Sequence, residues 1–182
     1  MVSQFISSHA VRLLGDLAFD FPEGTHAIGR LDQHSEGLLL LTTNKKITKL
    51  LFQGEKPHTR TYLVQVKNKV SKETVQLLSK GIEISASNGE KYMTNPCLVK
   101  LVNKPKYITD AEIPLHPNAE YSWLEISLTE GKFHQVRKMV AAVHHKCIRL
   151  IRTSIEDIDI KNLLPSEVKE VDEQYFFEKL KL

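Results

Sequence analysis

The sequence predicts an α+β fold, a mainly antiparallel sheet flanked by helices, in one domain that spans residues 1–182. Residues 61–67 and 121–129 alternate apolar and polar side chains with the period of two that is typical of strands. Residues 72–80 and 133–144 instead carry apolar side chains at helical spacing. Runs of strands interrupted by helices, with hairpin signals and no internal repeat or linker, favour a single α+β unit.

The first quarter of the chain predicts two helices and two strands. Apolar residues at helical spacing indicate a short helix over 8–19, which a proline and a glycine end. The apolar residues of 27–31 indicate a strand, and the leucine run within 38–43 indicates a second, fully buried strand. An asparagine then caps a helix expected over 45–52.

The middle of the chain continues after the strand at 61–67. A serine precedes the helix expected over 72–80, and a glycine stops it. The turn dipeptide Asn88-Gly89 indicates a hairpin that leads into a strand over 92–102. Prolines make 103–119 a loop.

The last predicted elements are the strand at 121–129, a helix over 133–144 that follows a glycine, and a strand over 147–154. On the helix, apolar side chains form one arc, Arg137 lies at the edge of this arc and Lys138 points away from it. An arginine at that margin can reach into a cleft, or it can extend along the surface into water.

The composition indicates an ordinary soluble globular protein, with 41% hydrophobic and 26% charged residues. We find no run of 18 apolar residues that would span a membrane and no secretory signal. Cys97 and Cys147 lack metal-ligand spacing and indicate reduced thiols. We therefore expect a cytoplasmic protein without a membrane partner.

The positive charges are unevenly distributed. Residues 131–155, named here the basic segment, contain six Lys or Arg residues and no acid. Residues 156–182 contain eight acids and four lysines. A basic segment with histidines beside it is typical of a surface that lies on a phosphate backbone. A solvated helix face would give the same pattern.

Residues 29–41 are the most informative part of the chain and read Gly-Arg-Leu-Asp-Gln-His-Ser-Glu-Gly followed by four leucines. They place Asp32 in a tight loop between two apolar strands, close to Arg30, where the environment of a carboxylate can be controlled. Such a position suits a catalytic carboxylate. It also suits an Asp in an ordinary turn that pairs with Arg30 and caps local structure.

Other kinds of site find less support. His144, His145 and Cys147 have no second cluster that would complete a four-ligand metal site, so we expect no metal. The sequence has no nucleophile elbow, phosphate-binding glycine loop or dinucleotide fingerprint. Asp32 and Glu36 are two carboxylates, as in a glycosidase, but a single loop gives no reason to expect them on opposite sides of a sugar.

Four segments, at 29–41, 60–66, 130–139 and 147–152, together resemble the signature of the pseudouridine synthases. The chain most resembles the RsuA-like branch, which acts on ribosomal RNA, and within it the members without a small N-terminal RNA-binding domain. Each segment alone would be weak, whereas four in the expected order are specific.

The resemblance implies the pseudouridine synthase catalytic fold, a long bent mixed sheet with a central cleft, and a cofactor-independent isomerisation of a uridine that is flipped out of the RNA. It implies that Asp32 is catalytic, that Arg137 pairs with it and that Tyr62 packs against the target base. It also implies that Arg30 helps to fill the space of the displaced nucleotide. From the residues alone, Tyr62 also suits a core strand, and Arg30 a phosphate contact or a surface salt bridge.

Ribosomal RNA is the partner that the resemblance implies, and we expect the chain to act as a monomer. Phosphate contacts position RNA without reading its sequence. We assign this role to five cations, namely Arg60, Lys132, Lys138, Arg149 and Arg152.

Two departures from the family pattern bear on activity more than on fold. The strand with a Lys-Pro-x-Gly motif that normally precedes the segment at 2–5 is absent, which would leave a sheet edge exposed. Residues 144–147 replace the usual glycine- and proline-containing turn. An RNA-binding or ribosome-assembly module that has lost catalysis is therefore the alternative to an enzyme, and a glycosidase-like hydrolase is a remote third option.

Overall fold

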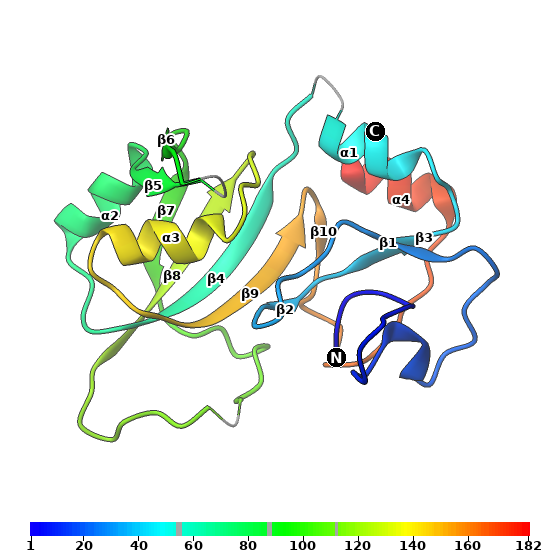
Figure 1. The fold of residues 1–182 in the computed structure, drawn as a ribbon, viewed down its shortest axis with the longest axis horizontal. Helices are drawn as coiled ribbons and strands as arrows, with labels where there is room; N and C mark the ends of the chain where they lie inside the picture. Colours follow the sequence, from blue (N-terminus) through cyan, green and yellow to red (C-terminus); the bar gives the residue numbers. More distant parts are fainter. Residues whose placement is uncertain (54–55, 87–88, 112) are drawn as a thin grey trace.

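The computed structural model describes residues 1–53, 56–86, 89–111 and 113–182. The elements form two halves on either side of strands β4 (Arg60–Lys67) and β9 (Cys147–Ile155) (Figure 1). One half, with both chain termini, holds β1 (His26–Ile28), β3 (Leu40–Thr42), α1 (Ile47–Gln53) and α4 (Glu173–Leu180). The other holds α2 (Lys72–Ser79), α3 (Gln135–Ala142) and a small hairpin.

The largest sheet of the described residues joins the two halves. Its strand order is β10–β9–β4–β8–β7, and β2 pairs with β9 outside this path. All of these pairs are antiparallel except β2 with β9, which is parallel. The remaining bounds are β2 (Glu36–Gly37), β7 (Leu98–Val102), β8 (Tyr121–Leu128) and β10 (Ile158–Asp159). The predicted α+β class with a mainly antiparallel sheet is confirmed.

Strand β4 lies in the middle of this sheet because both of its faces carry apolar side chains. Val64 and Val66 are fully buried in the cluster that α2 and α3 cover, together with Met139 of α3. Leu63 points to the opposite face and packs with Ile151 of β9. A strand that is covered on both sides reads as more continuously apolar than one with a solvated face.

The predicted hairpin is present as β5 (Glu83–Ser85) and β6 (Lys91–Met93), although Asn88 of the predicted turn lies outside the described residues. The strand predicted over 92–102 is divided into β6 and β7, which belong to different sheets. Gly81 allows this arrangement, since a Cβ there would lie 2.2 Å from the Thr94 carbonyl oxygen and its φ is +92°.

The helix predicted over 8–19 is wrong. The structure has only a short 3-10 turn, Leu14–Asp16, in this region. The backbone groups of Arg12 and Leu14 bond instead to residues 2–4: Val2 N–H donates to the Arg12 carbonyl (2.9 Å), and Leu14 N–H donates to the Gln4 carbonyl (3.1 Å). These long-range bonds replace the i→i−4 bonds that a helix would need.

Helix α4 was not predicted from the sequence. Asp172 caps it, because its Oδ1 accepts a hydrogen bond from Tyr175 N–H at 2.7 Å. Leu180 near its end is completely buried with Leu51 of α1 and Ile155 of β9. The helix therefore closes the core of the half that contains β1 and β3.

Candidate active site

The loop that carries Asp32 is fixed at both ends. Near its start, Leu31 N–H donates to Ser3 Oγ (3.0 Å), which ties the loop to the N-terminal segment. At its end, Gly37 packs directly on Arg152 of β9, where a Cβ would lie 2.2 Å from the Arg152 carbonyl oxygen. Leu38 N–H donates to that oxygen at 2.7 Å. The loop is thus held against β9 at one fixed register.

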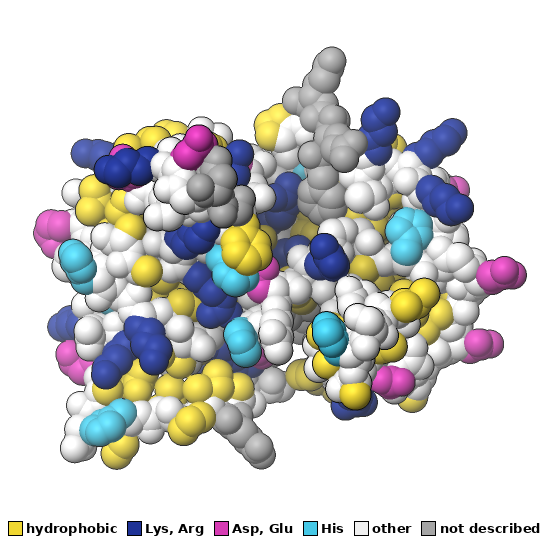
Figure 2. Space-filling view, in the orientation of Figure 1, with side chains coloured by type: hydrophobic (Ala, Val, Ile, Leu, Met, Phe, Trp, Pro, Cys, Tyr) yellow, Lys and Arg dark blue, Asp and Glu magenta, His cyan; other side chains and the backbone are white. Residues whose placement is uncertain are grey.

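Asp32 lines a cleft of about 1450 Å³, together with Arg30, Leu39, Thr109, Phe133 and His134. Lys, Arg, His and acidic side chains gather where the two halves of the molecule meet (Figure 2). The Asp32 side chain is 35% exposed, and its Oδ1 lies 3.6 Å from Nε2 of His134. The carboxylate is therefore partly enclosed but open to a ligand from the cleft.

Arg152 supplies a buried guanidinium near Asp32. It is 4% exposed, and its Nε donates to the Leu38 carbonyl at 2.9 Å. Its Nη2 is buried without a hydrogen-bond partner in the described part of the chain. Burial lowers the pKa of Arg152, while the nearby Tyr62 and Asp32 act in the opposite direction. The buried Arg152 guanidinium therefore interacts electrostatically with both Tyr62 and Asp32.

Tyr62 interacts electrostatically with two buried arginines, Arg60 and Arg152. It stands opposite Arg152 in the register of β4 and β9. Burial also lowers the pKa of Arg60, and Tyr62 opposes this effect. The Arg60 guanidinium reaches Gly131, where an added Cβ would lie 2.6 Å from Nη1. From the sequence we predicted that Arg60 and Arg152 contact RNA phosphates. Both side chains are buried, which does not suit contact with an RNA backbone.

Arg137, the predicted partner of Asp32, contacts the same loop at other atoms. Its Nη2 donates to the His34 carbonyl and lies 3.5 Å from Ser35 Oγ, and its Nη1 lies 3.5 Å from Cys147 Sγ. No ion pair or hydrogen bond joins Arg137 to Asp32 in the described residues. Arg137 thus ties α3 to the Asp32 loop in this structure.

Arg149 is a further case in which the assigned phosphate contact does not suit the structure. It is 6% exposed, and its Nε and Nη2 each donate to a Glu36 carboxylate oxygen at 2.8 Å. Its Nη1 donates to the Thr109 carbonyl at 2.7 Å. This bidentate pair occupies the guanidinium and fixes β2 on β9.

Three predicted site residues lie at the surface near the cleft. Arg30 is exposed and lines the cleft. Lys132 Nζ lies 4.5 Å from the centroid of the Tyr92 ring. Lys138 Nζ donates to the Ser85 carbonyl at 2.7 Å. These cations remain in positions that a phosphate can reach.

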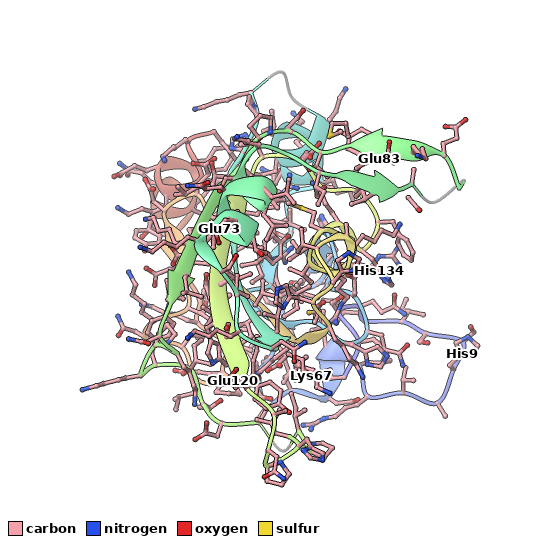
Figure 3. All side chains as sticks on the ribbon, turned by 90° about the vertical axis from the view of Figure 1, so that its left-hand side faces the viewer. His9, Lys67, Glu73, Glu83, Glu120 and His134 are labelled. Carbon is pink, nitrogen blue, oxygen red and sulfur yellow. The ribbon has the colours of Figure 1, made fainter. Side chains whose placement is uncertain are left out.

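Sequence reasoning did not connect His134 to Asp32. His134 stands just before α3 with a left-handed φ of 54° (Figure 3). Glu130 was also missed: it accepts hydrogen bonds from Tyr92, from Asn95 N–H and from Gln135 Nε2. Glu130 and His134 lie at the two ends of the turn that precedes α3, the helix that carries Arg137. This position was the sequence signal that could have pointed to both residues.

No group of three or more His, Cys, Asp or Glu side chains in the described residues could hold a metal ion. No helix in the described part of the chain is long and apolar enough to cross a membrane.

Comparison with known proteins identifies relatives of the whole fold. Residues 16–142 match the family model described as RNA pseudouridylate synthase. The chain is 31% identical over 171 residues to ribosomal large subunit pseudouridine synthase E of Vibrio parahaemolyticus, covering 93% of this chain and 69% of that protein. It is 32% identical over 149 residues to the protein of the same name from Xanthomonas axonopodis pv. citri, covering 81% and 76%.

A solved pseudouridylate synthase has a similar structure, with a TM-score of 0.71 and 27% sequence identity. The match covers 89% of this chain and 63% of the solved one, so the chain spans less than two thirds of that protein. The family that the four sequence segments predicted is confirmed. The chain belongs to the RNA pseudouridylate synthase family.

Proposed function

We propose that this chain isomerises one specific uridine of ribosomal RNA to pseudouridine, acting as a cytoplasmic monomer without a cofactor. The names of the relatives, ribosomal subunit pseudouridine synthases, support the choice of ribosomal RNA. The observation that carries the proposal is the position of Asp32. Asp32 lies in the segment that matches the family, lines the cleft and interacts electrostatically with the buried Arg152 guanidinium.

The reaction needs an ionised carboxylate in a partly enclosed site. The N1–C1′ bond of uridine breaks, the base turns, a C5–C1′ bond forms, C5 loses its proton and N1 gains one. A carboxylate can attack the sugar or base, or remove the C5 proton. Enclosure raises the pKa of an Asp, and a nearby cation lowers it. The Arg152 guanidinium and His134, whose Nε2 lies 3.6 Å from Asp32 Oδ1, are the groups that can interact with this carboxylate.

The target nucleotide must leave the RNA stack before Asp32 can reach it. We assign Arg30, which is exposed in the cleft, to the space that the flipped nucleotide leaves. Tyr62 is the candidate to pack against the flipped base. Arg137 is assigned to positioning, because it holds the backbone of the Asp32 loop through the His34 carbonyl.

The test measures tritium release from C5-labelled uridine in ribosomal RNA. We expect Asp32→Asn to lower turnover at least roughly a thousandfold, because the amide is nearly isosteric but neither nucleophilic nor basic. RNA affinity should stay nearly unchanged. Asp20→Asn, at an exposed position outside the cleft, is the matched control and should keep full turnover. An active Asp32→Asn variant would refute the assignment of Asp32.

The alternative function is an RNA-binding or ribosome-assembly module with the same fold. The observation that favours it is that Arg137 contacts the His34 carbonyl and not the Asp32 carboxylate. The same assay separates the two functions. Wild-type protein that binds ribosomal RNA but releases no tritium from it would support the binding module.

A further inference from the structure

Phe133 and His134 form a stacked aromatic pair in the cleft. Their ring centroids lie 3.9 Å apart, and the ring planes differ by 17°. The Phe133 side chain is 61% exposed and belongs to none of the hydrophobic clusters of the described residues. A stacked aromatic pair that lines a cleft beside a carboxylate can contact a ligand bound in that cleft.

The turn that holds this pair is rigid. Gln135 is buried, its Oε1 accepts from Lys132 N–H at 2.8 Å, and its Nε2 donates to Glu130 at 2.6 Å. His134 follows in the left-handed region and begins α3. The backbone that carries the two rings is therefore held in place before any ligand binds, which lowers the entropy cost of binding.

The pair lies next to the proposed catalytic carboxylate. Phe133, His134 and Asp32 line the same cleft, and His134 Nε2 is 3.6 Å from Asp32 Oδ1. The Lys138 ammonium lies 5.4 Å from the centroid of the Phe133 ring. An aromatic face with a cation beside it matches a nucleotide, because the base stacks on the ring and the phosphate meets the charge.

We propose that the Phe133–His134 pair is a stacking platform for an unpaired nucleobase that neighbours the target uridine in the RNA. The choice of RNA as ligand rests on the proposed function. The target nucleotide would occupy the space at Asp32. The Phe133–His134 platform lies next to that space, so it would receive the base of a nucleotide that neighbours the target in the RNA strand. Stacking accepts every base, so the platform adds affinity and holds the strand without selecting the sequence.

A tryptophan probe tests this proposal directly. The chain has one tryptophan, Trp123, which is half-buried on β8. In a Trp123→Phe and Phe133→Trp double variant, the indole at position 133 reports stacking. Titration with single-stranded oligouridylate should quench its fluorescence strongly. The wild-type protein should show little quenching, because Trp123 packs against the cluster of Leu63, Ile108 and Ile151. Equal quenching in both proteins would overturn the proposal.

Affinity measurements on the native tryptophan background give a second test. Phe133→Leu should weaken binding of the same RNA roughly five- to a hundredfold, as expected for the loss of one stacked base, and Phe133→Tyr should restore it. Leu77→Ala is the control, since Leu77 is an exposed apolar residue of α2 that does not line the cleft. An equal loss from Leu77→Ala, or no loss from Phe133→Leu, would contradict a platform at Phe133.

The outcomes separate this inference from the proposed function. Tritium release by the wild type without stacking at position 133 overturns the platform and leaves the synthase. Stacking without tritium release supports the platform and overturns the synthase. A wild-type protein that binds no RNA overturns both.

Discussion

The basic segment divides into two regions, one with lysines near the surface and one with buried arginines. On the turn before α3 and on α3 itself, Lys132 and Lys138 stay near the surface and contact aromatic rings. On β9, Arg149 and Arg152 are 6% and 4% exposed and bind to the chain itself. The uniform run of positive charge in the sequence had suggested a single phosphate-binding surface.

The difference shows that the residue type and the available hydrogen-bond acceptors decide whether a cationic side chain is buried or stays at the surface. Lysine carries a compact, strongly hydrated ammonium, whereas the guanidinium of arginine is weakly hydrated and tolerates burial with fixed acceptors. Glu36 and the Leu38 carbonyl provide these acceptors, more than a hundred residues before β9 in the sequence. The buried region thus holds the Asp32 loop, whereas the surface region keeps its ammonium groups near the surface.

The largest effect should come from forcing the loop off β9. Gly37→Ala would place a Cβ 2.2 Å from the Arg152 carbonyl oxygen at a φ of +103°. We expect a loss of about 3 kcal/mol in the free energy of unfolding, because backbone must move against backbone. For a chain of this size, that lowers Tm by roughly 6–12 °C, which calorimetry would measure.

Gly24→Ala is the matched control for this change. Gly24 has a φ of +79° but no atom within 4 Å of an added Cβ. It should cost only about 1 kcal/mol, from the backbone conformation alone. Equal losses at both positions would mean that the approach of the loop to β9 contributes nothing.

The second effect should come from removing the charge that compensates Arg149. Glu36→Gln leaves a buried guanidinium without its countercharge. Since Glu36 itself is 43% exposed, we expect about 2 kcal/mol of destabilisation, less than for a fully buried pair. Chemical denaturation would measure it, with the exposed Glu23→Gln as control. A stable Glu36→Gln variant that loses RNA affinity instead would return Arg149 to the phosphate contacts.

Local pattern predicted those parts of the fold in which neighbours in sequence share one environment. The strand at β8 follows from alternation, and α2 follows from Ser71 and its apolar spacing. The strand at β4 was predicted from the same alternation, although both of its faces are covered. The helix expected over 8–19 failed because its backbone bonds to residues 2–4. Helix α4 was not predicted, and its burial depends on contacts with α1 and β9.

The candidate site shows the same limit. The loop position of Asp32 was predicted from 29–41, and the cleft lies beside it. The roles of Arg152 and His134 near Asp32 were not predicted. The pairing of β2 with β9 brings Arg152 to the Asp32 loop, and a left-handed turn before α3 brings His134 there. Neither feature leaves a periodic signal in the sequence.

The smallest effect should come from the surface region. Lys138→Gln removes one ammonium near the cleft, which donates to the Ser85 carbonyl and stabilises little. We expect unchanged Tm, roughly fivefold weaker RNA binding at 0.1 M salt, and a slope of log affinity against log salt that is shallower by about 0.7, because one fewer counterion is released. Lys100→Gln, exposed on β7 and outside the cleft, should change neither quantity. If Lys138→Gln left the slope unchanged, or lowered Tm as Glu36→Gln should, the surface and buried regions would no longer be distinct.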